Sequence, residues 1–280
     1  MAQTNTRQAG IGKRGFARVL LLGALAAVLL ATVAADDASA AKVRGQLKSA
    51  DKKLGSTPVT LYRAGTQNKG PRELGRSTSR RNGKFAIRYD KPRGSNAVLY
   101  LVAGDGNKVR LATVLGLSPF PSKLIVNERT TVAAGFALAQ FLSGNRKIAG
   151  RSPGLQNASE MFKNVVNARK GRLVRVLKKP PNGEQTPTIE TFNSLANLLP
   201  RCVRDERRCA NLFSVTNAPG ESKAKGTLKA TANIARNPGN NAKRIFNHSL
   251  TGPTPYQPAV LQTDRPRSWT LALRFDGDGK

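Results

Sequence analysis

The chain has few of the residues on which most enzymes depend for acid–base or redox chemistry. Among its 280 residues are one histidine, two cysteines, one tryptophan and 16 acids. Any histidine-dependent mechanism would have to use His248, and a histidine near the end of a predicted helix more often contacts the last carbonyl groups of that helix. A phosphate-cradling glycine loop and a dinucleotide fingerprint are both missing. The sequence therefore predicts no catalytic residues and no cofactor.

Aromatic residues are also scarce. They make up 5% of the chain, whereas hydrophobic residues as a whole make up 39%. The cores must then consist mainly of Val, Leu, Ile and Ala, and we expect a fold of modest stability. A chain of this length suits one large domain or two ordinary ones, and the change of pattern described below favours two modules.

Acids are few relative to bases. The chain has 47 Lys and Arg against 16 Asp and Glu, which gives a net charge of +31. Such a charge attracts polyanions over several ångströms. Zinc-finger spacing and aromatic-and-basic RNA-binding motifs are missing, so we expect an anionic envelope polymer, an acidic polysaccharide or lipid headgroups as the partner, rather than genomic nucleic acid. A generally basic, solvated surface is the alternative.

The first 40 residues are typical of an export signal. Cations at positions 13, 14 and 18 precede an apolar run from Val19 to Ala35, and the small residues Ala38 and Ala40 follow. This order predicts a signal peptide over residues 1–40, cleaved after Ala40, with no transmembrane segment after cleavage. We therefore expect a secreted or extracytoplasmic protein, either released or associated with the cell surface. The alternative is an uncleaved anchor, because the apolar run approaches the roughly 17 to 25 residues that span a bilayer.

The two cysteines, Cys202 and Cys209, suggest one disulfide in an oxidising compartment. On one continuous helix their Cα atoms would lie about 10 Å apart, beyond the roughly 7 Å that a disulfide tolerates. We therefore predict a helix break between them, near Pro200 and the charged string 204–208. A zinc site is the alternative, but it lacks a second cysteine pair and a nearby histidine.

Short runs with β character recur between residues 42 and 126. Phe85, Ile87 and Tyr89 alternate with small or charged residues, which places the large apolar side chains on one face. Asn82-Gly83 supplies the positive φ angles of a tight hairpin. We expect an antiparallel β-sandwich over residues 41–126. The expected strands are Val43–Leu47, Val59–Tyr62, Leu74–Thr78, Lys84–Tyr89, Ala97–Ala103 and Val109–Leu115.

Three strings in this region carry a family pattern: Val43–Gly45, Pro58–Tyr62 and Thr78–Phe85. They resemble the carboxypeptidase-regulatory-like, transthyretin-like sandwich of exported bacterial proteins. In that family the module is a non-catalytic support or adhesion element. The resemblance implies no active site.

The pattern changes to helical spacing at Asn127, where Asn127 or Thr130 can cap a helix. Ser152-Pro153 predicts a second helix, capped by Ser152 and with Pro153 at the first helical position. Thr186-Pro187 repeats this device. Three further helices are expected. One begins at Cys209, one lies around Leu228–Ile234 and stops at Asn237–Gly239, and one lies at Ile245–Phe246.

These helices together predict an α+β chain of two modules, in which an all-α helical bundle over residues 127–250 contains the disulfide. Residues 251–280 are expected to form a Pro-rich linker and a short terminal strand. Trp269, Leu271, Leu273 and Phe275 alternate in that strand.

A second resemblance rests on five strings in the helical region. They are Asn127–Ala133, Gly154–Ala158, Pro181–Gly183, Leu195–Asn197 with the two cysteines, and Asn233–Pro238. They look like the helical region that precedes a β-propeller of the NHL or virginiamycin-B-lyase-like kind in exported bacterial proteins. In such relatives the propeller follows a Trp-Thr-Leu-Ala-Leu strand. The resemblance implies the front part of that architecture, without the propeller.

Two further motifs suggest chemistry that their context does not support. Gly150–Gly154 matches the G-x-S-x-G nucleophile elbow, with Asp205 and His248 in the hydrolase order. The residue after the nucleophile must donate its N–H to the oxyanion hole, and Pro153 has none. Ser152 is better explained as a helix cap. Asp276–Gly279 has the density of a calcium loop, but no downstream Glu completes an EF-hand, so we expect a terminal loop and no metal site.

The densest block of positive charge has no acid between Met161 and Gly183. We predict that it contacts a polyanion, with a solvated face as the alternative. The candidate contact residues are Lys163, Arg169, Lys170, Arg172, Arg175, Lys178 and Lys179.

The sequence favours a secreted or cell-envelope, non-catalytic binding or scaffold protein. One alternative is an accessory part of an extracellular β-propeller enzyme or sensor, which would make a propeller domain a partner. A second is a nucleic-acid-binding protein, which would require an uncleaved leader.

Overall fold

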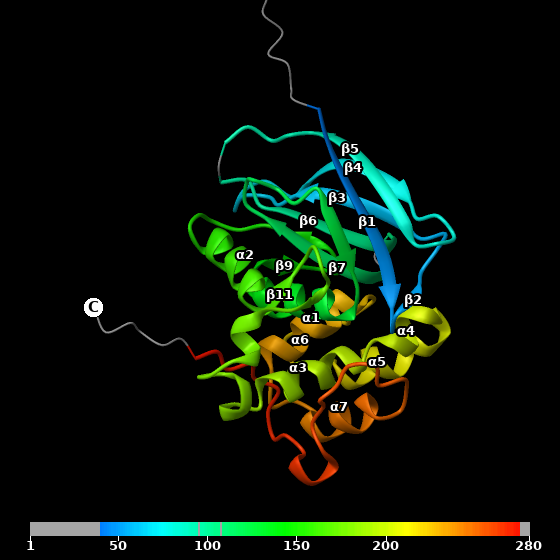
Figure 1. Cartoon of the computed structure of the whole chain (residues 1–280), viewed down its shortest axis with the longest axis vertical. Coiled ribbons are helices and arrows are strands. Elements are labelled where there is room, and N and C mark those ends of the chain that lie inside the picture. The colour runs from blue at the N-terminus through cyan, green and yellow to red at the C-terminus, as the bar shows by residue number, and fades with distance from the viewer. Residues whose placement is uncertain (1–39, 95, 107, 275–280) are drawn as a thin grey trace, which may run out of the picture. The chain divides into compact units, whose positions relative to one another are not determined.

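The computed structural model describes residues 40–94, 96–106 and 108–274. The described chain is mixed α and β, with the long strands first and the main helices after them (Figure 1). The predicted signal peptide, apart from Ala40, and Asp276–Gly279 lie outside the described residues. Each predicted β run forms a strand. The longer strands are β1 (Ala40–Ser49), β3 (Pro58–Arg63), β4 (Arg72–Thr78), β5 (Lys84–Asp90), β6 (Leu99–Asp105), β7 (Lys108–Gly116) and β8 (Lys123–Val126).

These strands form two sheets. In the first, β1 pairs antiparallel with β5 and with the two-residue β2 (Lys52–Lys53), and parallel with β8. In the second, the order is β4-β3-β6-β7 and every pair is antiparallel. The parallel β1–β8 pair departs from the antiparallel prediction. After β7 the chain crosses to the first sheet and runs beside β1 in the same direction, with the amide of Arg44 donating to the carbonyl of Ser122 at 2.9 Å.

The alternation read from the sequence sets the two faces of β5. Phe85, Ile87 and Tyr89 are buried, and the residues between them are exposed. Because side chains alternate across a strand, the first sheet buries one face and leaves the other to solvent.

The predicted hairpin at Asn82-Gly83 was wrong. A tight turn does form there, since the amide of Gly83 donates to the carbonyl of Arg80 at 2.7 Å and Gly83 has a φ of 73°. The strands on either side then find partners elsewhere, because β4 pairs with β3 and β5 pairs with β1. The turn therefore carries the chain from one sheet to the other.

The predicted helices form, with corrections at their ends. They are α1 (Glu128–Ala137), α2 (Gly154–Val165), α3 (Thr188–Asn197), α5 (Cys209–Val215), α6 (Thr227–Arg236) and α7 (Ala242–Ser249). The short helix α4 (Pro200–Arg204) was not predicted. Among these described helices, none combines the length and apolarity needed to cross a bilayer. Asn127 caps α1 in a capping box with Thr130, as the sequence predicts.

Ser152 does not cap α2, which corrects the prediction. The helix begins at Gly154, with Pro153 at the capping position and no side-chain cap. The Ser152–Pro153 peptide is cis, and Ser152 is exposed. Thr186 likewise does not cap α3; its hydroxyl donates to the carbonyl of Asn182 at 3.0 Å.

The region 127–250 is not all-α, which corrects a second prediction. It contains the two-residue strand pairs β9 (Leu142–Ser143) with β10 (Lys147–Ile148), and β11 (Val166–Asn167) with β12 (Arg172–Leu173). The second pair forms because α2 ends at Val165 and the residues that follow it turn back on themselves. Short 3-10 turns complete the region: η1 (Ala139–Phe141), η2 (Arg175–Lys178), η3 (Gly183–Gln185) and η4 (Glu206–Arg208).

The strands and helices share one hydrophobic core. Helices α1 and α6 pack against each other and against β7, beneath the strands in Figure 1. Their approach is close at Gly135, where an added Cβ would lie 2.0 Å from the Oγ1 atom of Thr231. The described strands and helices belong to one compact unit.

The predicted terminal strand was wrong, because Trp269–Arg274 has no ladder partner among the described residues. Trp269 is fully buried, and its indole donates to the carbonyl of Ala242 at 3.2 Å. Side chains replace the ladder. Asn182 exchanges two hydrogen bonds with the backbone of Arg274, at 2.7 and 2.8 Å, and Thr188 donates to the carbonyl of Ala272.

The Pro-rich segment before Trp269 is docked rather than a free linker. The Asn197 side chain pairs with the backbone N–H and C=O of Tyr256, at 3.1 and 3.0 Å. Asn193 donates to the carbonyl of Pro258 at 2.7 Å, and Ser194 accepts from the amide of Val260 at 2.9 Å. One polar face of α3 therefore holds the segment in place.

Candidate polyanion-binding surface

The seven cationic side chains predicted from the sequence are all exposed. They follow a continuous stretch that runs from the last turn of α2 through β11, β12 and η2. Lys163 forms an ion pair with Glu160 at 2.8 Å, and both side chains are about half exposed. The stretch thus presents its charges to solvent.

The tip of the β11–β12 hairpin is fixed by local geometry. The Asn167 carboxamide oxygen accepts from the amides of Arg169 and Lys170, at 3.0 and 3.2 Å. Gly171 takes a positive φ of 59°, and its carbonyl accepts from the side chain of Asn127 at 2.9 Å. The turn leaves Arg169 and Lys170 pointing away from the core.

The hairpin lies against the first sheet. The amide of Ile125, on β8, donates to the carbonyl of Ala168 at 2.9 Å. This contact places Arg169 beside Lys123, and both line the same groove. The predicted block therefore continues onto a surface formed by residues that are distant in the sequence. The most distant is Lys42, 127 positions before Arg169.

That groove crosses the outer face of the first sheet and has a volume of about 680 Å3. Its walls come from β1, β5, β8, the end of β4 and the hairpin tip. No Asp or Glu is among the described residues that line it. The cationic residues that line it are Lys42, Arg44, Arg80, Lys84, Lys123 and Arg169.

Like charges stand directly opposite each other on this face. Lys42 is in register with Arg88 on β5, and Arg44 is in register with Lys123 on β8. Opposed like charges destabilise a sheet, by a few tenths of a kcal/mol to about 1 kcal/mol for each pair. A negatively charged ligand in the groove would relieve this repulsion.

Sequence reasoning identified one of the six cations of the groove, Arg169, and missed the other five. A signal for some of them was present. Lys42 and Arg44 flank buried Val43, and Lys84 flanks buried Phe85, so the apolar alternation that predicts the strands also predicts a cationic outer face.

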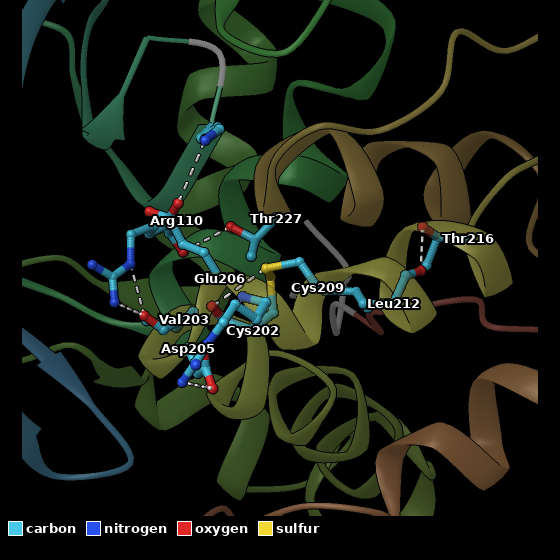
Figure 2. Close-up of a disulfide and its surroundings, with 11 residues drawn as sticks. Arg110, Cys202, Val203, Asp205, Glu206, Cys209, Leu212, Thr216 and Thr227 are labelled. Atoms are coloured by element: carbon cyan, nitrogen blue, oxygen red, sulfur yellow. Dashed lines mark hydrogen bonds and ion pairs between the residues drawn. A yellow bond between two sulfur atoms is a disulfide. The ribbon is translucent and has the colours of Figure 1, made fainter.

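The predicted disulfide forms between Cys202 and Cys209, whose Cα atoms lie 4.4 Å apart. The helix breaks between them as expected, since α4 ends at Arg204 and α5 begins at Cys209 (Figure 2). The cysteine side chains are nearly buried, at 2% and 8% exposed. The bridge therefore joins two short helices.

The disulfide region is tied to the second sheet. Figure 2 shows the guanidinium of Arg110, on β7, donating to the carbonyl of Val203. The Thr227 hydroxyl donates to the carbonyl of Arg110 at 2.8 Å. Burial lowers the pKa of Arg110, and the charge of Glu206 partly offsets this. These contacts give the disulfide-bonded cysteines a structural role where the helices meet the second sheet.

The residues of the sequence-level hydrolase motif have separate surroundings. Ser152 is exposed ahead of α2, whereas Asp205 forms ion pairs with Arg207 and Arg208, at 3.0 and 3.3 Å. His248 is half-buried near the end of α7, where burial and the charge of Arg201 lower its pKa. The structure does not assemble a triad from them.

A buried polar cluster joins the β-region to the docked C-terminal segment. The fully buried carboxylate of Glu128 accepts from the hydroxyls of Ser49 and Tyr256, both at 2.5 Å, and from the amide of Ala50 at 3.3 Å. Burial raises the pKa of Glu128, although these hydrogen bonds oppose the shift. The guanidinium of Arg129 lies 4.5 Å from the centre of the Tyr256 ring.

Comparisons with known proteins give little further information. No family model matches the chain, and no curated protein matches it. Among solved structures, a 9R-lipoxygenase from Cyanothece PCC8801 is similar with 14% identity, a TM-score of 0.21 and coverage of 63% of this chain. The match spans 26% of the length of that lipoxygenase. This likeness is too weak to inform the fold or the activity.

Proposed function

We propose that this protein is exported and binds an anionic polymer of the cell envelope without acting on it chemically. The observation that carries the proposal is the groove on the first sheet, where six cations and no described acid line one surface and Arg169 of the predicted block joins it. The retained cross-strand repulsion between Arg44 and Lys123 supports it as well. The disulfide is in keeping with an oxidising compartment.

The groove favours a polymer that is recognised by charge. Phe85 is the one aromatic residue among the described residues that line it, and it is 5% exposed. Bases of single-stranded nucleic acid bind by stacking on exposed aromatic side chains. An envelope polymer with regularly spaced acidic groups is therefore the better partner.

The proposal can be tested by retention on immobilised poly(glycerol phosphate) under a salt gradient. Replacing Lys42, Arg44, Lys84 and Lys123 by Gln should lower the salt concentration at elution by about 0.1 M or more, because screening ends a mainly electrostatic contact. The same decrease in the salt concentration at elution is expected for a second variant, in the β11–β12 hairpin and η2. It replaces Lys170, Arg172, Arg175 and Lys178 by Gln.

A matched control replaces Lys243, Arg244, Arg265 and Arg267 by Gln, which removes the same charge from exposed positions outside the groove. It should elute close to the wild type. Equal shifts in all three variants would show that net charge alone governs retention and would contradict the proposal. Export itself is tested by mass spectrometry of the secreted protein, which should begin at Ala41.

We also propose a family relationship. The two sheets would correspond to a carboxypeptidase-regulatory-like sandwich, and the helices to the all-α region that precedes an NHL or virginiamycin-B-lyase-like propeller. The formation of strands at Val43–Gly45, Pro58–Tyr62 and the end of Thr78–Phe85 supports the first part.

An accessory role beside such a propeller is the second candidate function. The fixed path of the chain at Arg274, where Asn182 holds the backbone on both sides, would suit the attachment of a further domain. Sequencing the DNA beyond codon 280 tests this idea, because repeated four-stranded blades would support it and their absence would contradict it.

A further inference from the structure

A second cleft lies where the loop after β3 meets the segment before α2. Its volume is about 890 Å3, within the roughly 300 to 1,000 Å3 typical of small-molecule sites. The loop 63–70 with Arg72 lines it, and so do residues of the segment before α2, among them Gly150, Arg151 and Ser152 of the G-x-S-x-G string. The first three residues of that string therefore line a cavity, although Asp205 and His248 are not among the described residues that line it.

Every charged residue that lines this cleft in the described part of the chain is positive. They are Arg63, Lys69, Arg72, Arg93 and Arg151. Arg63 and Arg72 are directly opposite in the β3–β4 register, so the sheet again carries a like-charge pair that costs stability. No Asp or Glu is among the described residues that line the cleft. An anionic ligand would offset the repulsion.

The cleft is also lined by four side-chain amides, whereas the described lining of the sheet groove has one, Gln46. The four are Gln67, Asn68, Asn96 and Gln156, and the Nε2 atom of Gln156 already donates to the backbone carbonyl of Asn96 at 3.0 Å. The loop amides of Gln67 and Asn68 can each donate and accept at once, which is the pairing that neighbouring sugar hydroxyls require. No aromatic residue is among the described residues that line the cleft, so they offer a nucleobase no surface on which to stack.

The loop that carries Gln67 and Asn68 is held in place. The amide of Gly65 donates to the carbonyl of Ile148 at 2.9 Å, and the amide of Gly150 donates back to the carbonyl of Gly65 at 3.2 Å. A Cβ added at Gly65 would lie 2.1 Å from the carbonyl oxygen of Lys69, so the loop closes tightly on itself. A loop fixed in this way loses little entropy when a ligand binds.

We infer that this cleft binds a short acidic oligosaccharide, with its acid groups at Arg63 and Arg72 and its hydroxyls at the amides of Gln67 and Asn68. The site is separate from the groove of the proposed function, because Arg72 and Thr78 stand at opposite ends of β4, about 20 Å apart at roughly 3.3 Å per residue. The acid group can be a carboxylate or a phosphate, since arginine pairs with both.

Calorimetric titration of the secreted protein, residues 41–280, tests the inference. The probes are trigalacturonic acid, a phosphorylated trisaccharide (maltotriose phosphate), neutral maltotriose and inorganic phosphate. We expect binding of one or both acidic trisaccharides, at least tenfold tighter than binding of inorganic phosphate, and no binding of maltotriose. Which acidic trisaccharide binds more tightly identifies the acid group.

Two double variants separate the contribution of the arginines to binding from that of the amides. Arg63→Gln with Arg72→Gln should weaken acidic trisaccharide binding at least tenfold, whereas the control Lys52→Gln with Lys53→Gln removes the same charge from β2 and should change it less than twofold. Gln67→Ala with Asn68→Ala should weaken trisaccharide binding about fivefold and leave phosphate binding unchanged. Thermal unfolding of each variant checks that it is folded.

Equal weakening by the arginine and lysine variants would overturn the inference, because net charge would then explain binding. Phosphate binding as tight as that of the trisaccharides would also overturn it, and would define a plain anion site. The quadruple groove variant described above should bind the trisaccharides normally, so failure of the polymer proposal and failure of this one give different results.

Discussion

Two regions of this protein concentrate charge in opposite ways. The cluster around Glu128 is fully buried, and hydrogen bonds from Ser49, Ala50 and Tyr256 surround its one acidic group. The groove on the first sheet is exposed, and six cations line it without a described acid. The first region satisfies its polar groups within the fold, and the second does not.

The difference indicates what each region is for. A buried carboxylate is tolerated only when hydrogen bonds replace the water it loses, so the Glu128 cluster holds β1, α1 and the docked segment together. Exposed like charges in register destabilise the sheet that carries them. Cations that the fold does not pair are available to a ligand, and the contrast can be tested by removing charge from each region.

The largest effect is expected from Glu128→Ala. The change leaves the hydroxyls of Ser49 and Tyr256 without an acceptor in a buried site, which should lower the free energy of unfolding by about 3 to 5 kcal/mol. Urea denaturation measures this value. The control is Glu160→Ala at the exposed ion pair with Lys163, which should change it by less than about 1 kcal/mol. Similar losses in both variants would show that burial does not distinguish the two carboxylates.

The pH dependence of stability sharpens the same point. Burial raises the pKa of Glu128 in the folded state, so the folded protein binds this proton more tightly than the unfolded chain does. The stability it contributes is present below the unfolded pKa, about 4.3, and is lost as the pH rises through the folded pKa.

Glu128→Gln removes this titration and keeps the shape of the side chain, because the Ser49 hydroxyl can turn to accept from the new amide. The free energy of unfolding of the Gln variant, minus that of the wild type, should therefore rise between pH 4 and the folded pKa and then level off. Urea titrations at several pH values measure this difference. A difference that stays constant with pH would mean that Glu128 does not titrate abnormally.

The smallest effect has the opposite sign. Lys42→Gln with Lys123→Gln removes one member of each like-charge pair in the sheet groove, and should raise the free energy of unfolding by about 0.5 to 1 kcal/mol at low salt. The gain should shrink in high salt because screening already weakens the repulsion. Lys243→Gln with Arg265→Gln serves as the control, and an equal gain there would attribute the effect to net charge.

Local patterns predicted the elements of this fold well. The alternation of Phe85, Ile87 and Tyr89 places β5 correctly, and the Asn127 cap starts α1 where the sequence indicates. The patterns failed where residues distant in the sequence determine which hydrogen bonds a segment makes. Trp269–Arg274 has strand-like alternation, but Asn182 and Thr188 take the hydrogen bonds that a neighbouring strand would have made.

The candidate site was predicted in part for the same reason. The cationic block around Arg169 is contiguous in the chain, so its charge density is visible in the sequence. Arg44 and Lys123 are 79 residues apart, and nothing in the sequence states that β8 pairs with β1 in parallel. The groove exists because that pairing brings them together.

The sequence by itself determined where most strands and helices lie, that Cys202 and Cys209 must meet across a broken helix, and that the protein is strongly basic. Those properties depend on backbone periodicity, on bond geometry and on composition, which are local or additive. The tertiary structure decided which cations share a face, that Glu128 is buried against Tyr256, and that the Pro-rich segment docks on α3. These depend on strand register and packing, which join residues through space and leave no local pattern in the chain.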